Sequence, residues 1–273
     1  MYNNIKKRPK IFKRLLWLDL WLFDKIIIKI KETENTRLNW EVRWRKSNLS
    51  IEDQLILMLM YLRSYTTYFY LWSILWVDES NAQRISIKIE NIIIKCWLFS
   101  LPKKSILQSE LETIIIDATE VQINRPKKKQ RKYYSWKKKK HTLKAQVIIS
   151  QKWQILRTNF AKWSTHDKKL YDQYKVNIND KTEKLMDSWY QWVQNDKNNV
   201  VIPYKKPKKW KLTKNEKIHN QNLSRRRIKV ENKLAEVKVF DILDEKYRNW
   251  RRRFWLRFNL ICGIVNYNNW FIN

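Results

Sequence analysis

The sequence predicts an all-α helix-turn-helix region followed by a mixed α/β domain. Between residues 49 and 95, apolar side chains recur at helical spacing, and a short polar stretch divides them into segments. From residue 113 the pattern changes to a continuous β-branched run, which is typical of a buried strand. The patterns that follow read strand, strand, helix, strand and helix, an order that indicates a mixed sheet covered by helices.

The N-terminal part of the chain is expected to be mainly helical, with a polar, loop-like stretch at residues 34–47. Residues 1–47 predict a small helical lead-in, and residues 48–100 predict the helix-turn-helix region. The first helix of that region is expected over residues 54–63. Its start is indicated by Ser50 with Asp53 three residues later, a combination typical of a helix N-cap.

Two further segments complete the expected helix-turn-helix. Residues 65–75 are apolar and aromatic, a polar stretch follows them, and residues 81–95 resume helical spacing. In a helix-turn-helix the second of the paired helices enters the major groove of DNA. The side chains near its start are therefore candidates for reading bases: Asn81, Gln83 and Arg84.

The α/β domain is expected over residues 108–273. Strands are expected at residues 113–116, 143–150, 154–160 and 182–186, and helices at residues 165–174 and 224–239. The two middle strands would join in a tight turn at Trp153, where glycine would suit the backbone better. Residues 195–220 are polar and basic and contain two prolines, so they predict an extended basic arm.

Three acids are candidates for a metal site. Asp117 and Asp187 each follow an expected strand, and open α/β sheets gather functional groups at the carboxyl ends of strands. Glu231 is the third candidate, because Arg227 and Lys238 fall within about 40° of it on one helix face. Carboxylates framed by cations suit a metal ion and a phosphate. Each feature alone also has an ordinary interpretation, as a turn residue or a surface ion pair.

Several sequence blocks together resemble a known family. They span residues 62–68, 116–120, 125–130, 134–138, 163–167, 187–192, 227–238, 247–249 and 257–260. On these blocks the chain resembles the bacterial insertion-sequence transposases of the DDE superfamily, in the group that joins a helix-turn-helix to a ribonuclease-H-like endonuclease domain. The resemblance extends over nearly the whole chain. One departure is Ser224, at a position where relatives often carry a tyrosine.

The resemblance implies a fold, a chemistry and partners. The fold is a ribonuclease-H-like mixed sheet, in which Asp117, Asp187 and Glu231 would ligate two Mg²⁺ ions, replaceable by Mn²⁺. Arg227 and Lys238 would act beside them. Such an enzyme cleaves DNA at the terminal inverted repeats of its element and joins the ends to target DNA, as a homodimer or a larger assembly. Two alternatives remain: a DNA-binding remnant without catalysis, and a related nuclease that cuts without joining.

The charge of the chain favours a polyanionic partner. Lysine and arginine number 58 against 26 acids, a net charge of +32, which favours DNA first and an anionic membrane second. The densest basic stretch, residues 127–140, supplies candidate phosphate contacts: Lys127, Lys128, Lys129, Arg131, Lys132, Lys137, Lys138, Lys139 and Lys140.

Two further features of the composition bear on the compartment. No run of 18 apolar residues occurs, so no membrane span is expected. The two cysteines, Cys96 and Cys262, lie far apart in sequence, which argues against a disulfide framework or a zinc site. A reducing bacterial cytoplasm, close to the nucleoid, is the expected location.

Sixteen tryptophans accompany a single glycine. Average usage would give about 19 glycines in a chain of this length. Tryptophan stands at positions 136, 163, 189 and 192, where the resembled family carries glycine. Some genetic codes read UGA as glycine and others as tryptophan, so we expect most of these positions to be glycine in the cell. The alternative is a genuinely tryptophan-rich binding protein.

Overall fold

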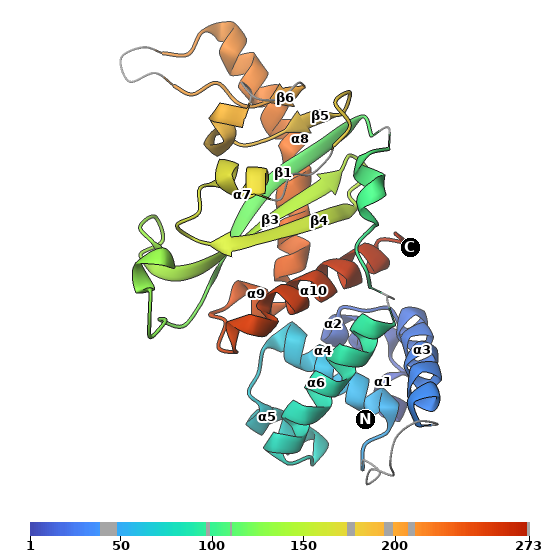
Figure 1. Ribbon diagram of the computed structural model, residues 1–273. Coiled ribbons are helices and arrows are strands. Elements are labelled where there is room, and N and C mark those ends of the chain that lie inside the picture. Colours follow the sequence, from blue (N-terminus) through green and yellow to red (C-terminus); the bar gives the residue numbers. More distant parts are fainter. Residues whose placement is uncertain are drawn as a thin grey trace. The chain divides into compact units, whose positions relative to one another are not determined.

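The computed structural model describes residues 1–38, 48–96, 99–109, 111–173, 178–193, 199–206 and 211–271. The chain divides into two compact units. We call the first the helical unit, which comprises Met1–Ser100, Lys238–Glu245 and Leu260–Asn273. We call the second the sheet unit, which comprises Leu101–Val237 and Lys246–Asn259. Figure 1 shows the helices of the first and the curled sheet of the second.

The helical unit is organised around one buried helix. Its helices are α1 (Tyr2–Ile5), α2 (Pro9–Leu16), α3 (Leu20–Leu38), α4 (Ile51–Ser64), α5 (Tyr68–Leu75), α6 (Glu79–Lys95), α9 (Asp241–Asp244) and the end of α10 (Phe254–Asn268). Nine consecutive residues of α4, from position 54 to position 62, are buried. Because α4 packs against α2, α3, α6 and α9, all of its faces are covered.

Side-chain caps define the helices of the helix-turn-helix region. Ser50 caps α4 by accepting a hydrogen bond from the Asp53 N–H at 3.1 Å, as the sequence predicts. Thr67 caps α5 in the same way, so this helix begins later than the expected position 65. Asp78 accepts from the N–H groups of Ser80 and Asn81, and α6 therefore begins two residues earlier than expected.

The one glycine of the chain stands where a helix meets another backbone. Gly263 lies in α10, and a Cβ atom built on it would collide with the backbone carbonyl of Phe99. The absent side chain therefore permits a close approach within the helical unit. No helix among the described residues is long and apolar enough to cross a membrane.

The sheet unit contains a ribonuclease-H-like mixed sheet, as the sequence predicts. Its strands are β1 (Thr113–Gln122), β2 (Tyr134–Ser135), β3 (Lys140–Ser150), β4 (Ile155–Lys162), β5 (Glu183–Leu185) and β6 (Val200–Val201). β3 pairs antiparallel with both β1 and β4, whereas β5 pairs parallel to β1 and β6 parallel to β5. The short β2 pairs with the start of β3.

Helices cover both faces of this sheet. The helical elements are η1 (Lys104–Leu107), η2 (Gln130–Lys132), α7 (Asp167–Gln173), η3 (Ser188–Val193), α8 (Lys214–Lys238), η4 (Arg251–Arg253) and the start of α10. Ile114 and Ile116 of β1 pack into a buried cluster with Tyr171 of α7 and Tyr190 of η3. Successive residues of a strand face opposite sides of the sheet. Figure 1 shows α8 crossing the face opposite this buried cluster.

Two elements of the sheet unit differ from the sequence-based expectation. β1 does not end before Asp117 but continues to Gln122, because its pairing with β3 extends to that residue. The expected arm at residues 195–220 contains β6 and the beginning of α8. Helix α8 begins at Lys214, ten residues before the expected start. A capping box precedes it, in which the Thr213 N–H donates to Glu216 Oε2 and the Glu216 N–H donates to Thr213 Oγ1.

Candidate active site

The register of two parallel strands places Asp117 and Asp187 side by side. Ile115 of β1 pairs with Leu185 of β5, and this is the last rung between the two strands. Each acid stands two residues beyond this rung, so both lie on the same side of the sheet, where the parallel pairing ends. Asp117 therefore lies within the long strand β1. It also lies just beyond the end of the parallel pairing with β5, which brings Asp187 close to it.

Helix α8 supplies a cation to this acid pair. The Nη2 atom of Arg227 lies 3.6 Å from Asp117 Oδ2, and its Nη1 atom lies 3.4 Å from Asp187 Oδ1. The arginine side chain is 13% exposed, and its Nε atom is buried without a hydrogen-bond partner among the described residues. The guanidinium therefore bridges the two carboxylates through ion pairs that are longer than good charge-assisted hydrogen bonds.

The third candidate acid affects the same carboxyl group. The pKa of Asp117 is raised to about 6, chiefly by burial, and the charges of Asp187 and Glu231 contribute to this rise. Arg227 and the N–H of Ala118, which donates to the carboxylate at 2.8 Å, oppose this rise. Glu231 lies one helical turn beyond Arg227 on α8. The three acids and the arginine thus form one electrostatic cluster.

Lys238 ends helix α8 and has another ion-pair partner. Its ammonium lies 3.4 Å from Asp244 Oδ1 of α9, within the helical unit. The contact that the structure gives it is therefore separate from the cluster of Asp117, Asp187, Arg227 and Glu231. Its role beside those acids stays a prediction.

The donor set suits a hard divalent cation. Carboxylate oxygens are the ligands that Mg²⁺ prefers in proteins, and a dication would relieve the repulsion that contributes to the raised pKa of Asp117. Within the described ranges, however, no three or more His, Cys, Asp or Glu side chains converge closely enough to hold a metal. The positive charge between Asp117 and Asp187 in this structure is the guanidinium of Arg227.

Comparison with known proteins agrees with this geometry. Residues 116–266 match the family described as DDE superfamily endonuclease, and residues 47–97 match the helix-turn-helix of DDE superfamily endonuclease. The chain is 38% identical over 260 residues to a protein of Microchaete diplosiphon described as "Probable transposase for insertion sequence element IS702", covering 94% of this chain and 93% of that protein. The chain belongs to the DDE superfamily of endonucleases. No solved structure gives a significant match.

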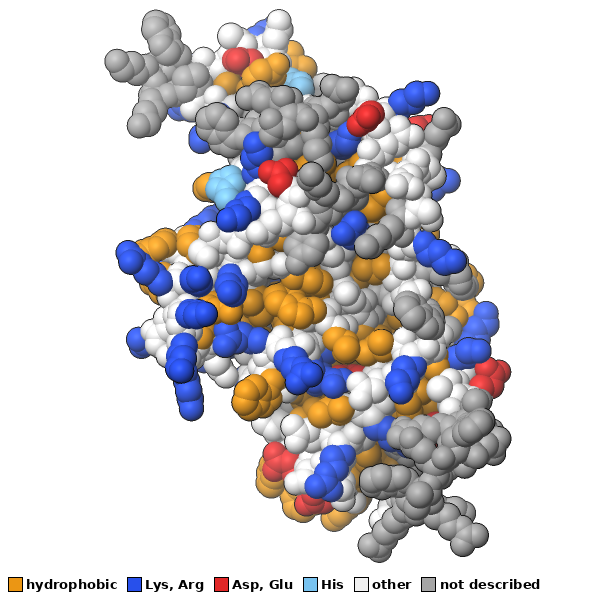
Figure 2. Space-filling view, viewed as in Figure 1, with side chains coloured by type: hydrophobic (Ala, Val, Ile, Leu, Met, Phe, Trp, Pro, Cys, Tyr) orange, Lys and Arg blue, Asp and Glu red, His pale blue; other side chains and the backbone are white. Residues whose placement is uncertain are grey.

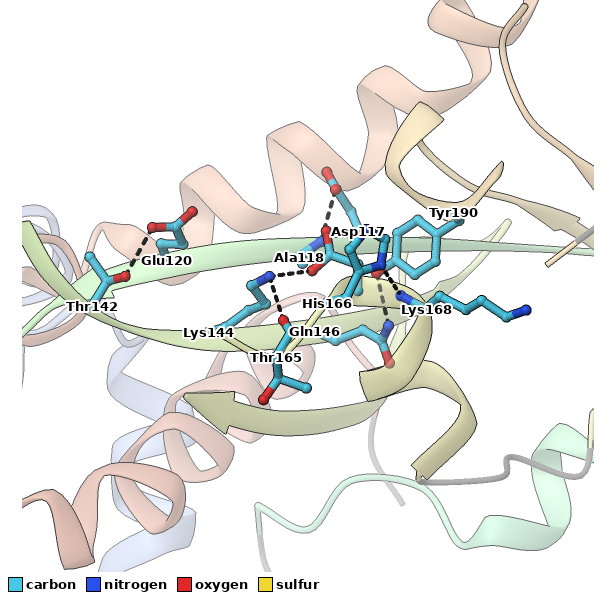
Figure 3. A network of polar contacts seen from close by, with 11 residues as sticks. Asp117, Ala118, Glu120, Thr142, Lys144, Gln146, Thr165, His166, Lys168 and Tyr190 are labelled. Carbon is cyan, nitrogen blue, oxygen red and sulfur yellow. Dashed lines mark hydrogen bonds and ion pairs between the residues drawn. The ribbon is translucent and has the colours of Figure 1, made fainter. Parts of the chain in front are cut away.

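A second polar network of the DDE domain, on the face of the sheet opposite Asp117, was not predicted from the sequence (Figure 3). Lys144 of β3 is nearly buried, and its ammonium donates to Asp167 Oδ1 at 2.6 Å and to the Thr165 carbonyl at 2.9 Å. These bonds tie β3 to the start of α7. The neighbouring His166 is exposed, and its Nδ1 accepts only a long local contact from the Lys168 N–H.

A buried amide chain continues this network. Asn159 Nδ2 donates to Gln146 Oε1 at 2.9 Å, and Gln146 Nε2 donates to the Tyr190 hydroxyl at 2.8 Å. Burial raises the pKa of the Tyr190 phenol well above its usual value, and the charge of Asp167 adds to that effect. Because Tyr190 follows Asp187 by three residues, this chain holds the segment that carries the second acid against the sheet.

The basic stretch of the DDE domain is exposed. All of its candidate phosphate-binding residues between positions 127 and 140 lie at the surface, and Figure 2 shows a gathering of Lys and Arg side chains in this region. The stretch is anchored at Tyr133, whose ring lies 4.6 Å from the guanidinium of Arg251 and 5.8 Å from the ammonium of Lys162.

The candidate base-reading residues are also accessible. Asn81, Gln83 and Arg84 occupy the first turns of α6 with exposed side chains, whereas Ala82 and Ser86 between and beyond them are buried. One face of α6 thus packs in the helical unit while the other is free to meet a ligand.

We expect Asp117→Asn to stabilise the protein in a pH-dependent way. The folded-state pKa is about 6 against a reference of 3.8, so the ionised carboxyl destabilises the fold as pH rises through this window. At pH 8 the variant should gain about 2–3 kcal/mol in the free energy of unfolding, and near pH 4 the gain should vanish. Denaturant titrations at both pH values measure this. The exposed Asp180→Asn is the control, and an equal gain at both pH values would contradict the prediction.

We expect Tyr190→Phe to lower the free energy of unfolding by about 1–3 kcal/mol, because the buried Gln146 amide then loses its acceptor. The exposed Tyr204→Phe serves as the control and should change stability by less than about 0.5 kcal/mol. Chemical denaturation compares the two. Equal stability of Tyr190→Phe and the parent would show that water replaces the hydroxyl.

Proposed function

We propose that the protein is a DNA transposase that cleaves the ends of an insertion sequence and transfers the strands to target DNA. The observation that carries this proposal is the convergence of Asp117, Asp187 and Arg227, with Glu231 in electrostatic reach. The similarity over almost the full chain to a protein described as an insertion-sequence transposase supports it. The intact acid cluster favours an active enzyme over a DNA-binding remnant.

The chain's own residues have separate roles in this reaction. Asp117, Asp187 and Glu231 would hold two Mg²⁺ ions, or Mn²⁺ in their place. When bound, such ions activate water or a 3′-hydroxyl and stabilise the leaving oxygen of the phosphodiester. Arg227 would bind a non-bridging phosphate oxygen through its guanidinium. Lys238, at the end of the same helix, is the second proposed phosphate ligand.

The DNA is bound by two regions in this proposal. Asn81, Gln83 and Arg84 on the exposed face of α6 read the terminal inverted repeats. The exposed basic stretch at residues 127–140 holds the phosphate backbone of the ends or of the target without reading sequence. Two copies of the protein, or more, bring two element ends together in the cytoplasm, where the chromosome lies.

Replacing any acid of the cluster should abolish strand cleavage and leave DNA binding intact. We expect Asp117→Asn, Asp187→Asn and Glu231→Gln each to reduce cleavage of terminal-repeat DNA by at least about 10³-fold, because metal catalysis contributes several kcal/mol. Gel-shift titration on the same DNA reports binding, and joining to a plasmid separates transposition from simple cutting.

The matched control for these variants is Glu183→Gln. Glu183 lies on β5, four residues before Asp187, and its carboxylate is paired with Arg226 outside the acid cluster. This variant should cleave like the parent. Full cleavage by Asp117→Asn, Asp187→Asn or Glu231→Gln would remove that residue from the site.

Neutralising the basic stretch should weaken DNA binding uniformly across sequences. Each phosphate contact that is lost should reduce the slope of log K against log salt by about 0.9. We expect the change of Lys127, Lys128, Lys137 and Lys138 to glutamine to lower the slope measured by fluorescence anisotropy. The control is a variant in which four lysines of the lead-in helices are changed to glutamine, at positions 13, 25, 29 and 31. An unchanged slope would mean that the stretch faces solvent.

We also propose that most tryptophan positions of this chain are glycine in the cell. Eight described residues other than glycine have a positive φ, and four of them are tryptophans: Trp17, Trp76, Trp153 and Trp270. Left-handed backbone favours glycine, since a side chain there costs about 1–2 kcal/mol. Trp17 and Trp76 directly follow helices α2 and α5, at the position where glycine most often ends a helix. The described motif positions 136, 163 and 189 lack a positive φ, so there the family pattern alone supports glycine.

A matched pair of tryptophans tests this proposal. Trp76 is 86% exposed with a φ of 53°, and Trp250 is 88% exposed with a φ of −58°. Trp76→Gly should raise the free energy of unfolding by about 1 kcal/mol, because it removes the left-handed strain. Trp250→Gly should not raise it, since glycine there only adds chain entropy. Thermal melts compare them, and UGG codons at these positions would overturn the proposal.

A further inference from the structure

The two neighbouring arginines of α8 are bound in different ways. Arg226 makes a two-pronged ion pair with Glu183, with Nη1 at 3.0 Å from Oε1 and a shorter contact from Nη2, which also donates to Thr113. Arg227 reaches two carboxylates at only 3.4 and 3.6 Å, and its buried Nε has no described partner. The first guanidinium is well satisfied, whereas the second retains donor capacity that its present partners do not use.

The position of Arg227 matters because the proposed metal ligands are its partners. A guanidinium between Asp117 and Asp187 supplies the positive charge that both acids need in the absence of a metal. A dication between the same oxygens would repel the guanidinium strongly at such short range in a partly buried site. Divalent metal binding therefore requires Arg227 to leave at least one of the two acids.

A phosphate group offers Arg227 another anionic partner. Arginine binds phosphate oxygens with two parallel N–H donors, and the unused Nε–H with an Nη–H provides that pair. A DNA phosphate beside the acids would thus draw the guanidinium away from them. The acids would then be free to take a cation.

We propose that Arg227 couples metal binding to DNA binding: in the free protein it blocks the space between Asp117 and Asp187, and a DNA phosphate removes it. This inference rests on the proposed metal-dependent function. By thermodynamic linkage, DNA raises the affinity for the metal and the metal raises the affinity for DNA by the same factor. The device delays metal loading, and therefore hydrolysis, until a phosphodiester is in place.

Two variants of Arg227 separate blocking from simple charge repulsion. Arg227→Lys keeps the positive charge, but an ammonium on a single stem cannot bridge two acids as a planar fork does. Arg227→Gln removes the charge as well. If Arg227 blocks the site, both variants bind the metal more tightly than the parent in the absence of DNA. If it acts by charge alone, only Arg227→Gln does.

The experiment is a titration of the full chain with Mn²⁺, read by electron paramagnetic resonance, with and without a 20-base-pair duplex. The amount of Mn²⁺ bound by a mixture of Asp117→Asn protein and the same duplex is subtracted, because it reports the manganese held by the DNA itself. We expect the duplex to tighten Mn²⁺ binding to the parent by about tenfold, within the usual range of coupling between sites. Arg227→Lys should bind about tenfold more tightly without DNA and gain little when DNA is added.

Controls keep the two proposals apart. Arg226→Lys, which changes the adjacent and well-satisfied arginine, should behave like the parent, and thermal melts establish that each variant is folded. Equal Mn²⁺ affinity of the parent and Arg227→Lys, with Asp117→Asn defective, would overturn the coupling while the metal site stands. Equal Mn²⁺ binding by the parent and Asp117→Asn in the presence of DNA would overturn both the metal site and the coupling.

Discussion

The short parallel pairing between β1 and β5 is the constraint on which the candidate active site depends. Residues 115 and 185 form its last rung, and a side chain two positions further on either strand points to the same face. The pairing extends over only three residues of each strand, yet it converts two acids 70 positions apart in sequence into neighbours. Helix α8 then adds Arg227 and Glu231 to these two acids.

Burial and like charge make this cluster unfavourable for the fold. Asp117 lies in a largely buried position among other acids, and its raised pKa records the cost of keeping it ionised. Arg227 offsets part of that cost in the free protein. On the opposite face of the sheet, the bonds from Lys144 to Asp167 and from Gln146 to Tyr190 hold the adjoining segments in place. A hydrogen-bonded network on one face of the sheet thus lies behind an electrostatically unfavourable cluster on the other.

Backbone conformation explains why the tryptophan content is informative. Gly263, the only glycine, sits in a helix where contact with Phe99 leaves no space for a side chain. At the left-handed positions after α2 and α5, in contrast, the chain carries bulky indoles. A protein with this many turns and helix ends ordinarily places glycine there. Glycine adopts this left-handed backbone without strain, whereas a tryptophan there is strained.

The sequence by itself determined the features that depend on neighbours a few residues apart. The capping of α4 by Ser50 and the turn at Trp153 could be predicted, because caps and turns are local, and the strand patterns indicated Asp117 and Asp187 as candidate acids. Only the tertiary structure decided how far β1 runs, since its extension depends on pairing with β3. It also decided that one guanidinium of α8 meets both acids and that Lys144 pairs with Asp167. These contacts join residues 23 to 110 positions apart. The periodicity within a single helix or strand does not indicate which distant side chains will meet when the protein folds.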